Sequence, residues 1–471
     1  MTNGSELTGK RVLVLGLGET GISMARWIAR EGGLVRVADT RSTPPALDAL
    51  RAALPEAEIR TGAFAESLLH GVDLVAASPG VPLATPVVQA ALARGLEVVG
   101  DVELFARFLA RHPGGARIVA ITGTNGKSTV TALAGRMCRA AALDCEIAGN
   151  IGPAVLTALM SRLDARRLPE AWVLELSSFQ LETTSSLAPD AATVLNVTAD
   201  HLDRYPDVEA YAAAKARIFE GGGVQVLNRD DRRSSAMRRA GRRVITFGLD
   251  AAPDHDDFGL LRMSGEHWLA KGATPLVPVR EMKIAGLHNA ANALAAFALC
   301  RAIGLPLLPL LGAVRRFEGL AHRFERIAEV EGVAFYDDSK GTNVGSTVAA
   351  LAGLARQMNG SGGKVVLIAG GEGKQQDFAP LRAAVAEAAR AVVLIGRDAP
   401  LLESALTSSG AAVERAASMQ EAVERAFDAA HPGDVVLLSP ACASFDMFAD
   451  YKQRGEVFCT AVRELEHARA R

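Results

Sequence analysis

The feature that most constrains the fold is an apolar strand at residues 117–121 that runs into the glycine-rich loop Gly123-Thr-Asn-Gly-Lys-Ser-Thr129. Such a loop turns successive backbone N–H groups inward, and the helix that follows favours anions at its N-terminus. Lys127 is then placed to meet β- and γ-phosphates, and Ser128 to hold Mg²⁺. Ile121 stands where the common phosphate-loop motif has its first glycine. Nucleotide triphosphate chemistry is therefore the first hypothesis, and a structural turn with a chance lysine is the alternative.

The composition indicates an α/β protein of several domains. A chain of 471 residues exceeds one ordinary core, so roughly two to four domains are expected. The hydrophobic content of 49%, the 45 glycines and the low aromatic share of 5% are typical of helices that alternate with parallel strands. The net charge of −2 gives no extended positive surface for nucleic acid or an anionic membrane. Negative substrates must therefore be held by individual Lys and Arg side chains.

Cysteine usage and hydropathy indicate the compartment. The five cysteines form no C-x-x-C pair and lie in apolar sequence, which indicates reduced thiols. The N-terminal residues are polar, and no apolar run approaches the roughly 20 residues of a membrane span. We therefore expect a cytoplasmic protein that binds no membrane. We also expect a monomer.

The N-terminal region begins with a βα unit of dinucleotide-binding type. A strand at 11–15 leads into Gly16-x-Gly18-x-x-Gly21 and a helix with apolar periodicity, and a second strand at 35–38 ends in Asp39. This fingerprint predicts NAD bound through Asp39, or another nucleotide whose diphosphate lies in the same loop. A tight strand-to-helix turn with no ligand is the third interpretation. All three stay open at this level.

Strands and helices alternate along the rest of the chain. A strand at 73–77, a helix at 102–110 and the breaker His112-Pro-Gly-Gly115 place the first domain boundary near residue 112. Turn-rich sequence from Arg242 to Leu287 predicts little regular structure, and an alanine-rich helix follows over 288–302. The expected strands of the middle region lie at 172–176, 192–196 and 224–227. A second doubly wound sheet is expected from strands at 333–336, 364–369, 391–395 and 434–438.

Polar side chains gather where the middle strands end. Glu175 is the best metal candidate, because it emerges directly from an apolar strand where an unpaired charge would be costly. Asp200 and His201 follow the next strand, and a solvated turn capped by Asp203 is nearly as good an interpretation of them. Lys215 lies in helical sequence, where a snorkelling surface lysine is the default.

The last region holds four further polar stretches, and basic and hydroxyl groups gathered there would suit a carboxylate substrate or nucleotide phosphates. The stretches are His322-Arg-Phe-Glu325, Asp337-Asp-Ser-Lys-Gly-Thr-Asn343, Gly370-Gly-Glu-Gly-Lys374 and Ser439-Pro-Ala-Cys-Ala-Ser444. Two of these residues also have a purely structural interpretation. Ser444 would be a simple helix N-cap, and Lys374 a solvated loop charge.

Taken together, these stretches resemble the Mur ligase family over nearly the whole chain. The resemblance rests on seven stretches in family order: Gly123–Thr129, Leu174–Glu182, Asn196–Pro206, His288–Asn292, Ala321–Glu325, Asp338–Asn343 and Ser439–Ser444. It implies an α/β fold of three domains: a Rossmann-like domain for a UDP-sugar (1–112), a central P-loop ATPase domain with a mainly parallel sheet (113–319) and a Rossmann-like domain for the amino acid (320–471).

The resemblance also implies an activity. It implies an ATP-dependent ligase that adds D-glutamate to UDP-N-acetylmuramoyl-L-alanine through an acyl phosphate, in the synthesis of peptidoglycan precursors. The implied cofactors are ATP, Mg²⁺ at two sites and a carbamoylated lysine at 215, and both partners are small molecules. A nucleotide sensor that uses NAD(H) is the alternative outside the ligases, and other Mur enzymes and folate polyglutamate ligases are the alternatives within them. The folate enzymes give no reason for the Gly16–Gly21 domain.

Site residues follow from the same resemblance. The catalytic set would be Lys127, Glu175, His201 and Lys215, and the metal ligands Ser128, Glu175, His201 and carbamoylated Lys215. ATP would meet Gly123, Thr124, Asn125, Gly126, Lys127, Ser128, Thr129, Asn292, Arg323, Asp338 and Lys340. The UDP-substrate would meet Gly18, Thr20, Asp39, Thr40, Arg41, Ser78, Gly80, Asn150 and Ser177. D-Glutamate would meet Thr342, Lys374, Ser444 and Tyr451.

The chain departs from the family pattern at three of its positions. Tyr451 stands where phenylalanine is frequent, Gly341 where alanine is common, and Ala199 at a position that is often acidic. The first of these changes the expected surroundings of the amino-acid carboxylate. The last removes a carboxylate next to the metal ligands without removing a ligand.

Overall fold

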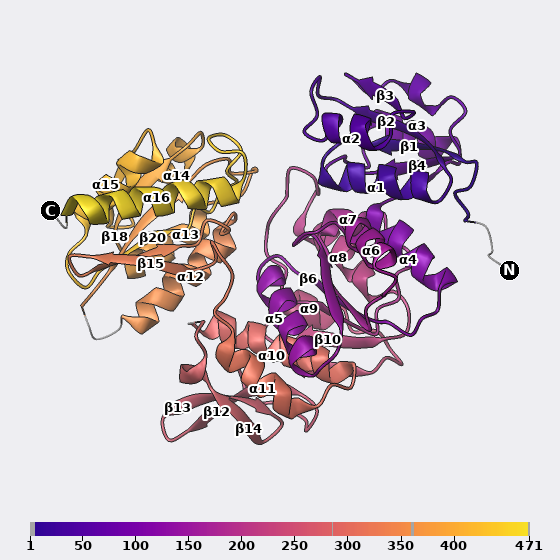
Figure 1. Ribbon diagram of the computed structural model, residues 1–471. Coiled ribbons are helices and arrows are strands. Elements are labelled where there is room, and N and C mark those ends of the chain that lie inside the picture. The colour runs from indigo at the N-terminus through magenta and orange to yellow at the C-terminus, as the bar shows by residue number, and fades with distance from the viewer. Residues whose placement is uncertain (1–4, 285, 359–361, 470–471) are drawn as a thin grey trace. The chain divides into compact units, whose positions relative to one another are not determined.

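The computed structural model describes residues 5–284, 286–358 and 362–469, which Figure 1 colours along the chain. The chain divides into two compact units. The first comprises the residues up to Val197, together with Glu209–Val277 and Ala293–Val314. The second comprises Thr198–Val208, Pro278–Asn292 and the residues from Arg315 onward. Each unit is described by itself below.

The N-terminal sheet has five parallel strands in the order β3-β2-β1-β4-β5. The strands are β1 (Arg11–Leu15), β2 (Leu34–Asp39), β3 (Glu58–Thr61), β4 (Leu74–Ala77) and β5 (Glu97–Val99). The helices are α1 (Glu19–Arg30), α2 (Leu47–Ala53), α3 (Pro86–Ala93), α4 (Asp101–Arg111) and the short η1 (Glu66–Leu69), labelled in Figure 1 where there is room. Strand order reverses between β1 and β4, and the crevice beyond the carboxyl ends of two such strands is where ligands bind in this type of sheet.

The central sheet has nine strands in the order β14-β13-β12-β11-β10-β9-β6-β8-β7. The strands are β6 (Arg117–Thr122), β7 (Cys145–Gly149), β8 (Ala171–Glu175), β9 (Ala191–Val194), β10 (Val224–Asn228), β11 (Val244–Phe247), β12 (Phe258–Met263), β13 (Glu266–Lys271) and β14 (Thr274–Pro278). In the part of this sheet that runs from β7 across to β12, every two neighbouring strands are parallel. The phosphate-loop strand β6 lies between β8 and β9, so its carboxyl end is flanked by the ends of these two strands.

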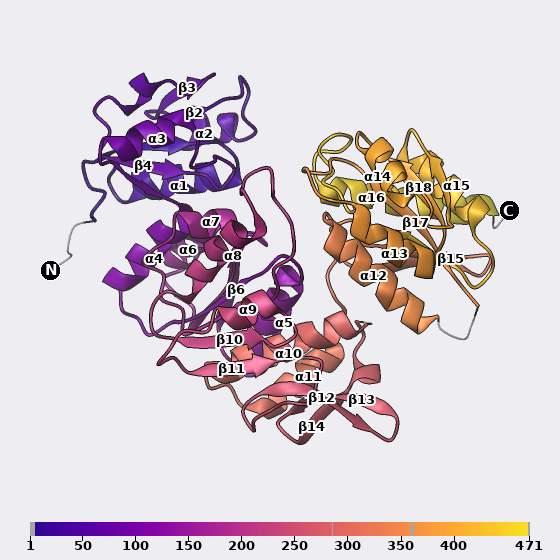
Figure 2. The ribbon, with the colours of Figure 1, turned by 180° about the vertical axis from the view of Figure 1, so that it is seen from behind.

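Helices of three to sixteen residues connect and follow these strands. They are α5 (Lys127–Ala140), α6 (Val155–Asp164), α7 (Ser178–Glu182), α8 (Val208–Ala216), η2 (Arg217–Phe219), α9 (Arg232–Ala236), η3 (Val279–Glu281), α10 (Leu287–Ala302) and α11 (Leu307–Arg316). Figure 2 shows the same elements from behind. The alanine-rich stretch expected to be helical is confirmed as α10.

The expectation of little regular structure between Arg242 and Leu287 is wrong. This stretch forms β11, β12, β13 and β14. Strands β12 and β13 pair antiparallel with Met263 opposite Glu266, so Ser264 and Gly265 form a two-residue loop. Both loop residues have positive φ, 49° and 83°, as the hairpin turns that match strand twist require. The strands are short and lie toward one edge of the sheet, where mixed polar and apolar residues obscure the alternation.

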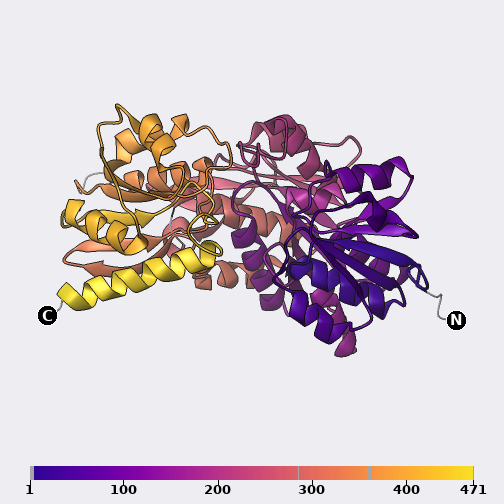
Figure 3. The ribbon, with the colours of Figure 1, turned by 90° about the horizontal axis from the view of Figure 1, so that it is seen from above.

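The C-terminal sheet has six strands in the order β15-β16-β20-β17-β18-β19. The strands are β15 (Glu325–Val330), β16 (Val333–Asp337), β17 (Val365–Gly370), β18 (Ala389–Ile395), β19 (Ala412–Arg415) and β20 (Val435–Leu438). Only β15 runs antiparallel to its neighbour among these described strands. The helices are α12 (Val344–Gln357), α13 (Ala379–Ala388), α14 (Ala399–Leu406), α15 (Met419–Ala429) and α16 (Tyr451–Arg469), the last being the long yellow helix of Figure 3.

Strand β17 shows why the C-terminal strands are apolar throughout. Its residues alternate between two cores: Leu367 packs in the cluster that contains α13 and α14 residues, while Val366 and Ile368 pack in the cluster that contains α15 and α16 residues. Because helices cover both faces, neither face of the strand needs polar residues. The expected α/β class and the second doubly wound sheet are confirmed. The predicted domain boundaries at 112 and 319 stay predictions.

Candidate active site

The phosphate loop joins the end of β6 to the start of α5. Gly126 has φ of 84°, a left-handed conformation that glycine adopts without strain, and caps α5, whose first residue is Lys127. The ammonium of Lys127 donates to the carbonyl oxygens of Gly123 at 2.9 Å and Thr124 at 2.8 Å. Ser128 is fully buried in the first turn of the helix. The loop thus has the conformation and the cation that a polyphosphate site requires.

Asn196 holds this loop, and sequence reasoning missed it as a site residue. Its carbonyl oxygen accepts the N–H of Thr124 at 2.9 Å, and its side-chain oxygen accepts the N–H of Asn125 at 2.8 Å. Its side-chain amide also donates to the carbonyl of Asn125 at 3.1 Å. The residue lies just beyond β9, which is paired with β6. An asparagine directly after a buried strand was the available signal.

Glu175 ends β8 and is completely buried, next to β6. Its Oε1 accepts the side-chain amide of Asn150 at 2.7 Å, and its carbonyl oxygen accepts the backbone N–H of Asn150 at 2.8 Å. Gly149 makes this approach possible, since a Cβ there would lie 2.3 Å from the Glu175 carbonyl oxygen. A buried carboxylate beside a phosphate loop fits the oxygen donors that Mg²⁺ prefers. The structure therefore places Asn150 against Glu175, whose strand β8 is paired with the phosphate-loop strand β6.

Lys215 lies on α8 with only 1% of its surface exposed. Its Nζ donates to the carbonyl oxygen of Gly123 at 2.9 Å and lies 4.3 Å from the centre of the Tyr211 ring. Lys127 donates to the same carbonyl oxygen, so both amines lie at the phosphate loop. A snorkelling lysine would reach solvent instead, and that alternative is wrong.

The N-terminal cradle lies at the switch between β1 and β4. A Cβ at Gly21 would be 1.9 Å from the carbonyl oxygen of Gly16, so the turn requires glycine there, while a Cβ at Gly18 would meet open space. Gly18 caps α1. The hydroxyl of Ser78 donates to the Gly16 carbonyl at 3.0 Å. The open helix N-terminus above this turn is where a diphosphate would be stabilised.

Asp39 is buried beside this cradle, and its carboxylate is already engaged. Oδ2 accepts the N–H of Leu17 at 2.6 Å, and both oxygens accept from the Arg41 side chain at 2.7 and 2.8 Å. The hydrogen bond from Arg41 lowers the pKa of Asp39 to about 2, partly opposed by burial. The carboxylate of Asp39 thus holds the loop and Arg41. Because its oxygens already accept these hydrogen bonds, the structure does not favour binding of an NAD ribose by Asp39.

The remaining candidates for the UDP-substrate have varied surroundings. Thr40, Gly80 and Asn150 are exposed, and Thr20 is half-buried. Ser177 caps α7 in a capping box: its Oγ accepts the N–H of Gln180 at 3.2 Å, and the Gln180 side chain accepts the N–H of Ser177 at 3.1 Å. The hydroxyl of Ser177 thus has a structural partner. Its contact with substrate stays a prediction.

In the second unit, Asp200 and Lys374 form a buried ion pair. Lys374 Nζ donates to Asp200 Oδ1 at 2.7 Å, and the Asn343 amide donates to Oδ2 at 3.2 Å. The two charged side chains are only 13% and 6% exposed, so the solvated alternatives for both residues are wrong. His201 follows with φ of 55°, and its Nε2 lies 3.8 Å from Asp200 Oδ2. The magnesium site predicted for His201 with Lys215 stays a prediction.

Two nucleotide candidates of this unit, Asp338 and Asn292, have side-chain hydrogen bonds to their neighbours. Asp338 Oδ2 accepts the hydroxyl of Ser439 at 2.8 Å, and burial raises the pKa of Asp338 to about 7, with Ser439 and Arg323 acting in the opposite direction. The amide of Asn292 donates to Asn289 Oδ1 at 3.1 Å on α10. Both residues are thereby held in place by neighbours of their own unit.

Lys340 and Tyr451 meet at the start of α16. Lys340 Nζ lies 3.2 Å from the Tyr451 hydroxyl and 4.7 Å from the centre of its ring. The candidates Thr342 and Ser444 lie nearby in sequence, half-buried and buried respectively. Ser444 does not cap a helix, because α16 begins only at Tyr451; its carbonyl oxygen accepts the N–H groups of Met447 and Phe448 instead. The N-cap alternative is wrong.

Arg454 supports this corner and was not predicted. It is 1% exposed on α16, and it donates to Ser339 Oγ at 3.0 Å, to the Ser339 carbonyl at 2.7 Å and to the Cys442 carbonyl at 3.1 Å. Burial lowers its pKa to about 10. It thus joins the loop after β16 to the loop after β20. Its partners include backbone carbonyls distant in sequence, so no local signal marked it.

Comparison with known proteins identifies the family. Three domain families match in order: "Mur ligase MurD-like, N-terminal domain" at residues 10–100, "Mur ligase middle domain" at 121–300 and "Mur ligase, glutamate ligase domain" at 322–442. The UDP-N-acetylmuramoylalanine–D-glutamate ligase of Nitrosospira multiformis is 57% identical over 98% of this chain and 97% of its own length. The chain belongs to the Mur ligase family. It is therefore an enzyme, a ligase.

Two further comparisons support this Mur ligase assignment. The ligase of the same name from Aromatoleum aromaticum is 57% identical over 99% of this chain and 100% of its own length. The crystal structure of UDP-N-acetylmuramate-alanine ligase MurC from Thermotoga maritima shares the fold, with a TM-score of 0.61 at 20% identity over 97% of this chain and 99% of that chain. The three-domain α/β architecture expected from the resemblance is thus confirmed. Within the described ranges, every helix is too short or too polar to cross a membrane.

Proposed function

We propose that this Mur ligase uses ATP to join D-glutamate to UDP-N-acetylmuramoyl-L-alanine, in the cytoplasmic synthesis of peptidoglycan precursors. The observation that carries the proposal is the phosphate loop after β6, with two lysine amines at the Gly123 carbonyl and the buried Glu175 at the neighbouring strand end. Close relatives along the full chain, named for this reaction, support the choice of substrates.

The proposed chemistry begins at the phosphate loop. Lys127 and the N–H groups of the loop hold the β- and γ-phosphates of ATP, while Ser128 and Glu175 are the residues that would hold Mg²⁺. When bound, Mg²⁺ neutralises charge on the transferring phosphoryl group. Lys215, as a carbamate, would supply with His201 the oxygen and nitrogen ligands of a second ion. Asn292, Arg323, Asp338 and Lys340 complete the nucleotide set.

The UDP-substrate and D-glutamate bind at two other sites. The uridine diphosphate lies over the N-terminus of α1, where Gly18 leaves open space and Arg41 is held by Asp39. D-Glutamate lies against Thr342, Lys374, Ser444 and Tyr451, where lysine supplies the charge that a carboxylate requires. A chain with net charge of −2 needs such local cations for anionic substrates.

The reaction then proceeds in two steps. The alanine carboxylate attacks the γ-phosphorus of ATP, so that a carboxyl oxygen–phosphorus bond forms and ADP leaves. The neutral amine of D-glutamate attacks the carbonyl carbon of the acyl phosphate, an amide bond forms as the nitrogen loses one proton to solvent, and inorganic phosphate leaves with the carboxyl oxygen. Positioning and charge neutralisation are the main demands of phosphoryl transfer.

A phosphate-release assay tests this function. The purified chain is supplied with ATP, Mg²⁺ and UDP-N-acetylmuramoyl-L-alanine, and D-glutamate is compared with L-glutamate, lysine and alanine. We expect rapid release only with D-glutamate, and none when either the UDP-substrate or the amino acid is omitted. Release with another amino acid alone would assign a different Mur reaction, and no amino-acid-dependent release would favour a nucleotide sensor.

The Tyr451→Phe variant tests the contact between Tyr451 and Lys340. The substitution keeps the ring over Lys340 but removes the hydroxyl 3.2 Å from its ammonium. Loss of one such hydrogen bond, about 1 kcal/mol, predicts a rise of roughly fivefold in KM for ATP or D-glutamate. Steady-state kinetics measure it, with Tyr336→Phe as control, since Tyr336 packs on Phe324 in the same domain. Identical KM values in Tyr451→Phe and wild type would contradict the role.

A further inference from the structure

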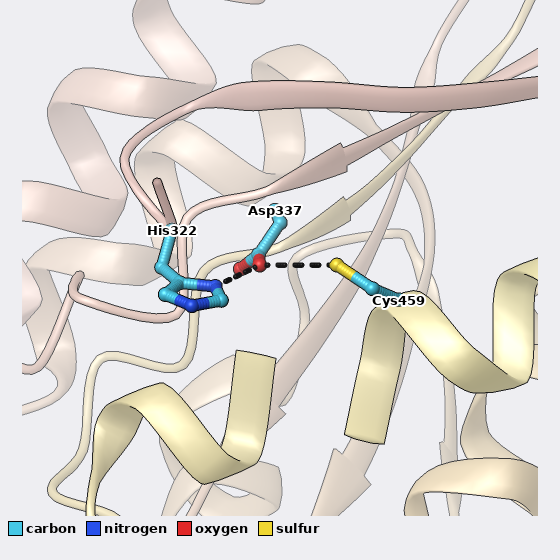
Figure 4. A group of neighbouring side chains, drawn as sticks. All are labelled: His322, Asp337 and Cys459. Carbon is cyan, nitrogen blue, oxygen red and sulfur yellow. Dashed lines mark hydrogen bonds and ion pairs between the residues drawn. The ribbon is translucent and has the colours of Figure 1, made fainter. Parts of the chain in front are cut away.

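Three side chains of the kinds that bind metals, those of His322, Asp337 and Cys459, lie together in the C-terminal domain beside the nucleotide candidates. His322 Nδ1 lies 2.7 Å from Asp337 Oδ2, and the thiol of Cys459 lies 3.5 Å from the same oxygen. All three donor atoms lie within 4.8 Å of one another. Figure 4 shows the imidazole and the thiol pointing toward the carboxylate from opposite sides. Within the described ranges this is the one such group of three.

The surrounding backbone holds these donors in place. Asp337 ends β16 and is fully buried, while its other oxygen, Oδ1, accepts the N–H of Ser339 at 2.8 Å. His322 is 15% exposed and has φ of 60°. A Cβ at Gly455 on α16 would lie 2.2 Å from His322 Nδ1 and 2.8 Å from Asp337 Oδ2. Glycine at 455 is therefore required for the imidazole and the carboxylate to lie so close to α16.

We propose that His322, Asp337 and Cys459 bind one thiophilic divalent cation, with Zn²⁺ the ion that this donor set selects. Imidazole, carboxylate and thiolate are the ligands that Zn²⁺ takes in tetrahedral sites, where a water completes the coordination. Bond lengths of about 2.0–2.3 Å place such donors roughly 3.3–3.6 Å apart. The sulfur–oxygen distance of 3.5 Å already fits, and the nitrogen–oxygen distance of 2.7 Å must widen by under an ångström, roughly 0.7 Å.

Binding of the cation releases one proton, which comes from the Cys459 thiol. Burial raises the pKa of the Cys459 thiol to about 12, with the charge of Asp337 acting in the same direction, so the sulfur carries a proton before the cation arrives. Binding forms the metal–sulfur bond and releases that proton to solvent. The imidazole proton that faces Asp337 at Nδ1 moves through solvent to Nε2, so that Nδ1 of the neutral ring can bind the cation. No oxidant or reductant is needed.

The cluster is connected to the residues assigned to ATP. The carbonyl oxygen of His322 accepts the N–H of Lys340 at 3.1 Å, and Asp337 directly precedes Asp338. Widening the contact between His322 and Asp337 therefore shifts the loop that carries the nucleotide candidates. We expect Zn²⁺ to lower ligase activity at constant Mg²⁺. This effect on activity rests on the proposed function, whereas the binding of the cation does not.

Cobalt spectroscopy of the full-length chain tests binding without using activity. Protein freed of metal by a chelator is titrated with Co²⁺, and the near-ultraviolet charge-transfer band of a thiolate bound to cobalt is recorded. We expect one equivalent of Co²⁺ to produce the band and one equivalent of Zn²⁺ to remove it. Cys459→Ala should lose the band and weaken Co²⁺ binding at least roughly tenfold, as loss of one metal ligand implies. His467→Ala, an exposed histidine on the same helix, should bind like wild type.

The other outcomes separate binding of the cation from its effect on ligase activity. A band that is absent from wild type, or unchanged in Cys459→Ala of normal circular dichroism, would overturn the site. Cys459→Ser, which keeps the size of the side chain but replaces sulfur, guards against misfolding of the first variant and should also lose the band. If both variants lose cobalt binding but Zn²⁺ inhibits them as strongly as wild type, the coupling to activity is wrong. Normal cobalt binding with no amino-acid-dependent turnover would contradict the proposed function alone.

Discussion

Replacing Lys127 with alanine is expected to lower kcat by about 10²–10³-fold, the usual cost of removing one charge-stabilising donor from a transition state. Lys127 is the first residue of α5, and its ammonium is held over the phosphate loop by the carbonyls of Gly123 and Thr124. The cation therefore already lies at the loop, where it would exchange these carbonyls for phosphate oxygens. Steady-state phosphate release at saturating substrates measures the effect.

The same variant should bind the UDP-substrate normally. The proposed diphosphate site at Gly18 and Arg41 belongs to a different sheet from the phosphate loop. Equilibrium titration with UDP-N-acetylmuramoyl-L-alanine therefore separates a catalytic defect from a folding defect. Lys271→Ala, which alters a lysine of the β12–β13 hairpin paired with Asp256, serves as control and should retain turnover. Near-normal kcat in Lys127→Ala would refute the assigned role.

Replacing Lys215 with alanine is expected to lower turnover by about 10²-fold or more, and added small carboxylates should restore part of it. The amine of Lys215 is buried at the Gly123 carbonyl that Lys127 also contacts. The proposed carbamoylation would turn this buried amine into an oxygen-bearing anion, the kind of ligand that Mg²⁺ prefers. In the alanine variant, acetate or formate can enter the space that the side chain leaves and supply the missing oxygens.

Rescue must be distinguished from a general salt effect. Activity of Lys215→Ala is compared in acetate, formate and chloride at equal ionic strength, and thermal unfolding confirms that the variant is folded. Recovery in the carboxylates alone supports the carbamate. A folded, inactive variant that no carboxylate restores would leave Lys215 as a structural lysine whose hydrogen bond to Gly123 supports the loop.

The sequence was sufficient for the elements with strong periodicity. The strand at β1 and the helix at α10 agree with expectation, because unbroken apolar runs and alanine-rich sequence favour one structure each. The β12–β13 hairpin was missed, since its signal was only Ser264 and Gly265 in a turn with positive φ. Short strands with polar residues near a sheet edge carry little alternation, so their pairing depends on the rest of the sheet.

Site residues divide in the same way. Loop residues such as Lys127 follow from local sequence, since the turn, the cation and the helix are contiguous. Asn196 and Arg454 bind backbone groups of Asn125 and Ser339, far away in sequence, so only the folded chain shows what they hold. Burial was the other missing quantity. Lys215 and Lys374 read as surface lysines in sequence, whereas the fold places their charges in buried contacts with Gly123 and Asp200.

The central claim is that ATP activates the muramoyl-linked carboxylate as an acyl phosphate before the amino acid attacks. Isotope tracing tests it most directly: UDP-N-acetylmuramoyl-L-alanine is prepared with ¹⁸O in the alanine carboxylate and converted with ATP and D-glutamate. The account predicts that the inorganic phosphate released carries one carboxylate oxygen for each peptide bond formed. Phosphate that carries no label, in a reaction that still forms the peptide bond, would contradict it.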